Sequence, residues 1–166
     1  MGLKYLSNKW NKKYASNLSE EARLKYRSNL LGSDLRITNF GGGNTSSKIE
    51  KVDPITGGKT QVLWVKGSGG DLGSIDLNGF AQLYMEKFNL LEKKYNDLES
   101  EDKMVEYYPL CKFGEGGRPA SIDTPLHALL PFKHIDHLHP DWAIALAAAK
   151  NGEAHLKIFN ANFNRN

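Results

Sequence analysis

Hydrophobic residues recur along the chain at two different spacings, and the helical spacing appears in several segments. Between Ser19 and Gly32 the apolar positions follow one helical face, with Ser19 as a candidate N-cap and Gly32 as the end. Residues 80–95 repeat this amphipathic spacing, and residues 121–130 and 140–150 predict two shorter helices. The last of these is rich in alanine and begins at a proline, which the first turn of a helix accepts.

Stretches of alternating or β-branched residues lie between these helices and predict strands. Residues 35–38 alternate in polarity, and residues 48–52 and 61–66 form a candidate hairpin around a turn that contains proline and glycine. Residues 135–139 form another short extended stretch before the last predicted helix. This mixture of strands and helices indicates a layered domain of the α/β or α+β class.

Length and composition favour one globular domain in a reducing compartment. The chain has 166 residues, of which 40% are hydrophobic, so residues 1–166 can form a single domain around its own core. The formal net charge of +3 is small, and no nucleic-acid partner is expected. Cys111 is the only cysteine, which excludes an intramolecular disulfide and fits the cytoplasm. No apolar stretch has the length of a signal peptide or a membrane span, so we expect a cytoplasmic protein without a membrane partner.

The pair His137-Leu138-His139 is the sharpest chemical signal. In a strand, residues i and i+2 project to the same face, so both imidazoles can reach one ion. Imidazole nitrogen suits zinc and neighbouring first-row metals. Two ordinary histidines on a strand are the alternative, but the pair ends a strand just before a helix, where α/β folds commonly build sites. His134 is expected on the other face of the strand, outside the metal site.

Two glycine-rich loops form the second signal. In residues 41–46, three glycines precede Asn44, a threonine and a serine, so the backbone can approach a ligand and offer N–H groups. Residues 66–70 have the same character, and neither loop is a P-loop because the Gly-Lys-Ser/Thr ending is absent. Each loop alone is more often a turn, whereas two such loops after neighbouring strands favour a phosphate cradle. Lys66 is then either a charge on the phosphate side or a solvent-exposed lysine.

The third signal lies at the start of the helix predicted over residues 121–130. Ser121 is a good N-cap, and a helix N-terminus favours an anion. Asp123 then lies in the first helical turn. There it either complements the helix dipole or moves a proton beside the metal, and the pattern leaves both roles open. His127, one turn further on, is expected to be a buried structural residue rather than a ligand.

As a set, these residues resemble the class II aldolase/adducin family. The segments that carry the resemblance are, in chain order, residues 43–46, 66–69, 121–127 and 137–140. Residues 65–69, 116–127 and 134–142 are most similar to the aldolase half of bifunctional rhamnulose-1-phosphate aldolase/alcohol dehydrogenase proteins. The resemblance extends from about residue 35 to residue 152, and the combination of segments is specific although each alone is weak.

The resemblance implies a three-layer α/β/α domain with a mostly antiparallel central sheet. It also implies a lyase, dependent on zinc or another divalent first-row metal, that cleaves a ketose 1-phosphate such as rhamnulose 1-phosphate into dihydroxyacetone phosphate and lactaldehyde. As a Lewis acid, the metal would stabilise the enediolate that C–C cleavage produces, so no lysine Schiff base is needed. By position, the resemblance assigns His137 and His139 to the metal, Asn44, Ser68, Gly69 and Ser121 to the substrate phosphate, and Asp123 to the place of a catalytic glutamate.

Two departures from the family pattern bear on activity. Aspartate is one methylene shorter than glutamate, so Asp123 must approach more closely or act through water. The family's third zinc histidine follows the pair at some distance, and His155, the only later histidine, lies in a predicted helix that does not resemble that site. We therefore expect a C-terminally truncated family domain, whose metal site is completed by water or by a neighbouring subunit.

Other functions fit the same residues. A sugar-phosphate epimerase or dehydratase would use similar metal and phosphate groups, and an adducin-like module would keep the fold without metal chemistry. A dehydrogenase would require a separate domain, because no Gly-x-Gly-x-x-Gly follows a strand here. Family members are commonly symmetric oligomers, so self-association is expected as well.

Overall fold

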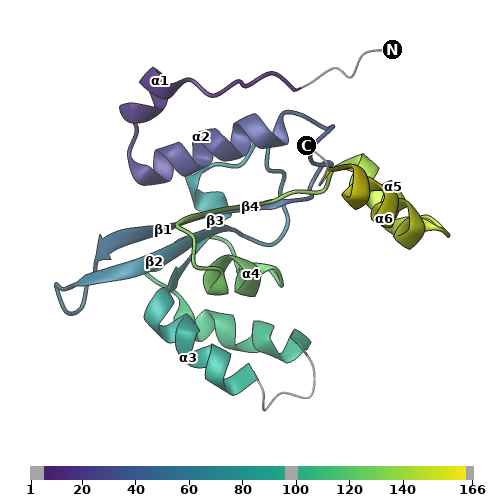
Figure 1. Cartoon of the computed structure of the whole chain (residues 1–166). Helices are drawn as coiled ribbons and strands as arrows, with labels where there is room; N and C mark the ends of the chain where they lie inside the picture. Colours follow the sequence, from purple (N-terminus) through teal and green to yellow (C-terminus); the bar gives the residue numbers. More distant parts are fainter. Residues whose placement is uncertain (1–5, 96–100, 164–166) are drawn as a thin grey trace.

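The computed structural model describes residues 6–95 and 101–163, and an antiparallel sheet lies at its centre (Figure 1). The strands are β1 (Asn44–Val52), β2 (Lys59–Lys66), β3 (Phe80–Tyr84) and β4 (His134–His137). They lie in the order β3-β2-β1-β4, and each neighbouring pair is antiparallel. The strands predicted at residues 48–52, 61–66 and 135–139 are therefore confirmed, with shifted ends.

Helices cover both faces of this sheet. They are α1 (Lys12–Ser16), α2 (Glu20–Gly32), α3 (Met85–Tyr95), α4 (Thr124–Leu129), α5 (Asp141–Ala148) and α6 (Gly152–Phe163), with 3-10 segments η1 (Leu77–Gly79) and η2 (Glu101–Cys111). α2 packs against one face, whereas α3 and α4 pack against the other (Figure 1). The three-layer α/β/α arrangement implied by the resemblance is confirmed, and the sheet is antiparallel throughout its described strands.

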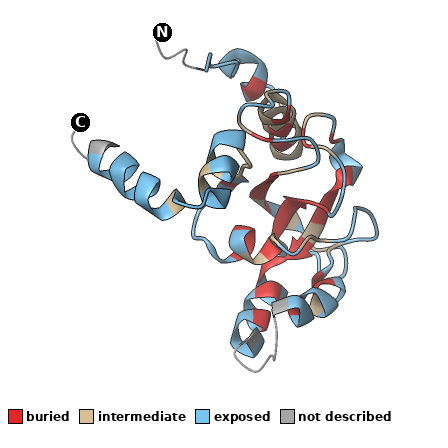
Figure 2. Cartoon of the chain, turned by 90° about the vertical axis from the view of Figure 1, so that its right-hand side faces the viewer, coloured by how far each residue is buried: buried red, intermediate tan, exposed pale blue. Residues whose placement is uncertain are grey.

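Strand β2 separates two hydrophobic cores, since successive side chains of a strand point to opposite faces. Val62 and Trp64 pack with Leu24 of α2 on one face. Leu63 and Val65 pack on the other face, against the helical layer formed by α3, η2 and α4. Figure 2 shows the resulting band of buried residues through the sheet. Residues 62–65 of β2 are all apolar, as expected for a strand segment that is covered on both faces.

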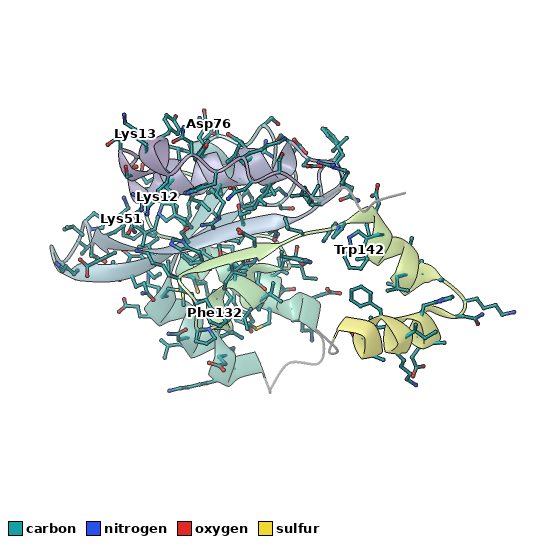
Figure 3. The ribbon with its side chains drawn as sticks, turned by 45° about the horizontal axis from the view of Figure 1, so that its top comes forward. Lys12, Lys13, Lys51, Asp76, Phe132 and Trp142 are labelled. Carbon is teal, nitrogen blue, oxygen red and sulfur yellow. The ribbon has the colours of Figure 1, made fainter. Side chains whose placement is uncertain are left out.

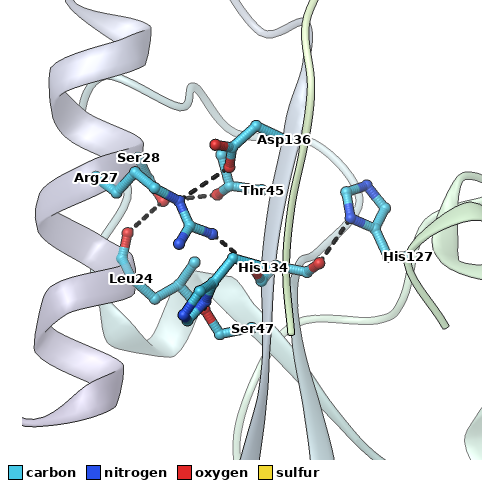
Figure 4. Close-up of polar contacts among 9 residues, drawn as sticks. Leu24, Arg27, Ser28, Thr45, Ser47, His127, His134 and Asp136 are labelled. Atoms are coloured by element: carbon cyan, nitrogen blue, oxygen red, sulfur yellow. Dashed lines mark hydrogen bonds and ion pairs between the residues drawn. The ribbon is translucent and has the colours of Figure 1, made fainter. Parts of the chain in front are cut away.

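Between α2 and the first half of β1, the contacts are made by polar side chains (Figure 4). Arg27 Nε donates to Asp136 Oδ1 at 2.9 Å, joining α2 to β4. The hydroxyls of Ser28 and Thr45 lie 2.6 Å apart, joining α2 to β1. These contacts fix the lateral position of the strand that ends at His137.

The helix predicted from Ser19 to Gly32 is confirmed, but the strand predicted at residues 35–38 is wrong. Ser19 Oγ accepts the N–H of Ala22, as an N-cap does. Residues 35–37 form turns, because the carbonyl of Asp34 accepts the N–H of Ile37 at 3.0 Å. These local hydrogen bonds replace the ladder that a strand would need.

The helix predicted over residues 80–95 is half wrong. Phe80–Tyr84 is strand β3, and only Met85–Tyr95 is helical. The apolar residues at the start of this segment suit either structure, and pairing with β2 decides for the strand: Phe80 pairs with Lys66, and Leu83 pairs with Leu63.

The helix predicted over residues 121–130 is shorter than expected. It begins at Thr124, so Asp123 rather than Ser121 occupies the N-cap position. Asp123 consequently lies before the first helical turn, and its carboxylate makes no capping hydrogen bond. Pro125 occupies an early helical position, where a missing N–H costs little.

Helices α5 and α6 form a hairpin that projects from the sheet (Figures 1 and 2). The helix predicted over residues 140–150 is confirmed as Asp141–Ala148, with Pro140 at its N-cap position. Trp142 of α5 packs against Phe159 of α6, with ring centroids 6.1 Å apart (Figure 3). Within residues 6–95 and 101–163, no helix has the length and apolar composition needed to cross a membrane.

Candidate functional site

Three strand ends meet at one edge of the sheet. β1 begins at Asn44, β2 ends at Lys66 and β4 ends at His137, and antiparallel pairing places these ends together. Asn44 pairs directly with His137, and paired residues project to the same face, here the face that carries α4. A pocket of about 420 Å³ opens at this edge, lined by both glycine-rich loops, Lys66, Asp123 and His139.

His137 and His139 turn one nitrogen each towards the other. Their Nε2 atoms lie 3.2 Å apart. Two nitrogens bound at about 2.05 Å to one tetrahedral zinc ion would be about 3.3 Å apart, so this spacing fits a shared metal ion. The described part of the chain contains no cluster of three His, Cys, Asp or Glu side chains that could hold a metal, and His155 lies exposed on α6. The predicted pair is thus brought together, but the described residues supply no third protein ligand.

Asp123 directs its carboxylate towards this pair. Its Oδ2 accepts an N–H of Asn44 at 3.1 Å, and its Oδ1 lies 4.0 Å from His137 Nδ1. That Nδ1 is buried and has no hydrogen-bond partner among the described residues. A carboxylate with one oxygen held and the other facing the pocket can accept or deliver a proton there.

Asn44 links the carboxylate to the predicted anion-binding side of the pocket. Its side chain is buried, and its amide nitrogen also donates to Ser121 Oγ at 2.8 Å. Its Oδ1 accepts from Lys66 Nζ at 3.5 Å. The predicted substrate-binding residues Asn44 and Ser121 therefore lie in contact with each other, and Asn44 also contacts Asp123.

Asp71, which directly follows the second glycine loop, contacts the first one. Its Oδ1 accepts the N–H of Gly41 at 3.1 Å, and its Oδ2 accepts the N–H of Gly73 at 3.0 Å. Ser68 and Gly69, both predicted to bind substrate, line the same pocket as the carboxylate. Gly69 has φ +68°, a left-handed conformation that other residues rarely adopt.

Close packing brings the second loop against the segment that leads to α4. The N–H of Ser68 donates to the carbonyl of Pro119 at 2.8 Å. A Cβ on Gly67 would lie 2.4 Å from the Cβ of Arg118, so only glycine permits this approach. The loop residues and Ser121 line the same pocket.

Lys66 is a site residue for which the sequence left two interpretations, and the solvent-exposed one is wrong. Its side chain lines the pocket, and the residue is 3% exposed. Burial lowers the pKa of the Lys66 ammonium, while the charges of Asp123 and Asp71 act in the opposite direction. The sequence signal that could have indicated burial is its position at the end of the buried run in β2.

Two further histidines lie outside the pair, as predicted. His127 is fully buried, with Nδ1 2.8 Å from Ser46 Oγ, and burial lowers its pKa to about 4 (Figure 4). His134 Nδ1 lies 2.9 Å from Ser47 Oγ, on the face of the sheet opposite to His137. Neither ring belongs to the histidine pair.

Comparison with known proteins agrees with this geometry. The sequence profile of the Class II Aldolase and Adducin N-terminal domain matches residues 24–164. The chain is 41% identical over 145 residues to the uncharacterized oxidoreductase YuxG of Bacillus subtilis (strain 168), covering 87% of this chain and 21% of YuxG. It therefore spans about a fifth of the length of this relative.

A solved structure shares the fold as well. The N-terminal class II aldolase domain of a conserved protein from Thermoplasma acidophilum superposes with a TM-score of 0.74 at 32% identity, over 88% of this chain and 66% of that one. Class II aldolases generally depend on a divalent metal, which agrees with the spacing of the two histidines. The profile match covers most of the sequence and includes every residue of the pocket described above. The chain therefore belongs to the class II aldolase and adducin family.

Proposed function

We propose that this domain is a metal-dependent aldolase that cleaves a ketose 1-phosphate, such as rhamnulose 1-phosphate, into dihydroxyacetone phosphate and an aldehyde. The observation that carries the proposal is the position of Asp123, bound by Asn44 and 4.0 Å from His137 in one pocket with two glycine-rich loops. This combination supplies the three functions that the reaction needs: metal binding, proton transfer and recognition of a phosphate group.

The residues present fit a divalent metal held by the Nε2 atoms of His137 and His139. When bound, such a metal would polarise the ketose carbonyl and the adjacent hydroxyl as a Lewis acid. Imidazole ligands suit zinc and neighbouring first-row metals, and zinc is our first choice.

Asp123 would transfer the proton to and from C3 of the substrate. Cleavage breaks the C3–C4 bond, leaves the electron pair on C3 and transfers the proton of the C4 hydroxyl to water, which converts C4 into the aldehyde carbon. Asp123 would then deliver a proton to C3, and in the synthetic direction it would remove one. Asn44 would keep the carboxylate oriented, because it holds Oδ2 and leaves Oδ1 towards the pocket.

A substrate assay with purified protein tests the proposal. After loading with zinc, the chain is incubated in parallel with rhamnulose 1-phosphate and ribulose 5-phosphate, and dihydroxyacetone phosphate is measured. We expect its release from rhamnulose 1-phosphate only. Epimerised ribulose 5-phosphate without any C–C cleavage would indicate the related epimerase chemistry. Failure to take up zinc, cobalt or manganese in stoichiometric amounts would favour a non-catalytic, adducin-like module.

A further inference from the structure

The strand that carries the first candidate metal ligand is short and lies at the edge of the sheet. β4 has four residues and, among the described strands, it pairs with β1 alone. The N–H of Lys48 donates to the carbonyl of Lys133, and hydrogen-bonded pairs alternate in an antiparallel ladder. The backbone groups of His134 and Asp136 therefore point to the open edge. Side-chain contacts consequently matter more for the position of β4 than for that of a central strand.

Arg27 of α2 contacts both strands of this pair. Its Nε donates to Asp136 Oδ1 on β4 at 2.9 Å (Figure 4). Its Nη2 donates to the carbonyl of Ser46 on β1 at 2.6 Å. Ser46 and Ile135 form one of the hydrogen-bonded pairs, so this carbonyl points towards β4. The planar guanidinium, which is partly buried, thus lies across the junction between the two strands.

This contact is joined directly to the histidine pair. Asp136 precedes His137 in the chain, and their side chains project from opposite faces of β4, towards α2 and towards α4. His139 follows the end of the strand, and its Nε2 lies 3.2 Å from that of His137. A displacement of β4 relative to β1 would therefore move His137 relative to Asn44 and Asp123, which lie on β1 and before α4.

We propose that Arg27 is a positioning residue for the metal site, which acts through Asp136 on the strand that presents His137. This inference rests on the proposed function and deepens it, because it takes the histidine pair as the metal-binding group. In this role Arg27 touches neither metal nor substrate. Histidine ligands bind a metal ion tightly when their positions are fixed before binding, and groups behind the ligands typically change metal affinity about ten- to hundredfold.

Arginine suits this position because one planar guanidinium serves two acceptors at once. The carboxylate of Asp136 and the carbonyl of Ser46 belong to different strands, so a single flat group that binds both keeps the strands at a fixed separation. Lysine would keep the charge, but its ammonium is a compact charge on a flexible stem. Arg27→Lys should therefore retain only part of the effect.

Titration of the complete 166-residue chain with Co²⁺, followed by the visible absorption of the bound ion, tests the proposal. The part of the signal that is lost in His139→Ala is assigned to the histidine pair. Arg27→Met and Asp136→Ala should each weaken Co²⁺ binding to the pair about ten- to hundredfold, and Arg27→Lys should weaken it less. In the double variant the loss should not exceed the larger of the two single losses, because both changes remove the same contact.

Lys25→Met is the matched control. Lys25 lies on the same helix, and its Nζ is 2.8 Å from Asp76 Oδ1, an ion pair that does not involve β4. This variant should keep the Co²⁺ affinity within about twofold. Urea unfolding of each variant, without Co²⁺ and at one fixed Co²⁺ concentration, separates positioning from stability. Loss of a merely structural contact lowers the free energy of unfolding equally in both conditions, whereas loss of positioning lowers it more when Co²⁺ is present.

Unchanged Co²⁺ affinity in Arg27→Met and Asp136→Ala would overturn the proposal, and so would an equal loss in Lys25→Met or additive losses in the double variant. An unchanged chain that binds no Co²⁺ through the histidine pair would contradict this proposal and the proposed function together. Co²⁺ binding that depends on Arg27, without cleavage of any ketose, would contradict the aldolase proposal alone. Cleavage of rhamnulose 1-phosphate by a chain whose Co²⁺ affinity does not depend on Arg27 would contradict the role of Arg27 alone.

Discussion

Asp123 occupies a helix N-cap without capping the helix, and this freedom gives the carboxylate its place in the pocket. Asn44 takes one oxygen, at 3.1 Å, and the other oxygen faces His137. The shorter side chain of aspartate, compared with glutamate, therefore still reaches the vicinity of the histidine pair. The position of its backbone just before α4 brings it there.

Replacing Asp123 by asparagine should separate metal binding from catalysis. Asp123→Asn keeps the size of the side chain but cannot carry a proton, so zinc content should be unchanged while kcat for cleavage falls about 10²- to 10⁴-fold. Metal analysis and steady-state kinetics measure the two effects. Asp102→Asn, an exposed carboxylate on η2, is the control and should leave both unchanged. Undiminished turnover of Asp123→Asn would remove this residue from the mechanism.

His127 should make stability depend on pH. The buried ring has a pKa of about 4, whereas the unfolded chain binds this proton near pH 6.5. Because the unfolded state then binds more protons, the free energy of unfolding should fall as pH decreases from about 6.5 to about 4, by at most about 3 kcal/mol from this residue. Urea unfolding at about pH 7 and about pH 5 measures the fall.

Two variants isolate the contribution of His127. His127→Gln should show a smaller loss of stability between the two pH values, since glutamine does not titrate. His155→Gln changes an exposed histidine on α6 and should keep the pH dependence of the unchanged chain. The same pH dependence in His127→Gln as in the unchanged chain would contradict the assignment.

At the residue scale, the sequence predicts the placement of side chains well where it follows from local spacing, and less well where it depends on burial by distant segments. The i, i+2 spacing predicted that His137 and His139 lie together and His134 elsewhere, and the structure agrees, although β4 ends at His137 and His139 follows the strand. The burial of Lys66 could not be predicted in this way. It depends on the neighbouring Asn44 and on a loop packed against residue 118, both distant in the chain.

At the scale of elements, the end of α2 is fitted closely to the loop before η1. Asn29 Nδ2 donates to the carbonyls of Leu72 and Ile75, at 3.2 and 3.1 Å. A Cβ on Gly32 would lie 2.0 Å from the backbone nitrogen of Gly73. Gly32 thus permits direct contact between α2 and the loop before η1. This loop contains Asp71 and follows the second glycine loop.

Gly32→Ala should therefore destabilise the fold by about 3 kcal/mol, because the backbones must separate. Urea unfolding gives the value. Gly58→Ala is the control: its φ is not positive, its nearest neighbour would be Thr56 Oγ1 at 3.4 Å, and its effect should stay within about 0.5 kcal/mol. Equal stability of the two variants would mean that α2 can move away from the loop without cost.

The element errors share one physical cause. Residues 80–84 have apolar positions that suit a helix or a strand, and pairing with β2, whose residues lie 14 to 22 positions earlier in the chain, decides for the strand. At residues 35–37, the carbonyl of Asp34 accepts local hydrogen bonds, and none of the described strands pairs with this segment. The helix or strand propensity of a segment predicts its structure only where the tertiary contacts of the fold favour the same structure.

At the scale of the whole molecule, one sheet edge collects segments from four parts of the chain. The start of β1 and the ends of β2 and β4 meet there, together with the segment before α4. The family resemblance predicted this assembly, whereas periodicity alone predicted only a layered domain. The pocket forms only when all these strands pair, so no single sequence motif predicts it.

The most direct test of the proposed chemistry is proton exchange on dihydroxyacetone phosphate in D₂O, because this half-reaction needs no aldehyde. For the zinc-loaded chain we predict that NMR records replacement of one C3 proton by deuterium. Exchange should stop in His139→Ala, which should no longer bind zinc, and in Asp123→Asn, which should. Retention of both C3 protons by the zinc-loaded, unchanged chain would contradict the account.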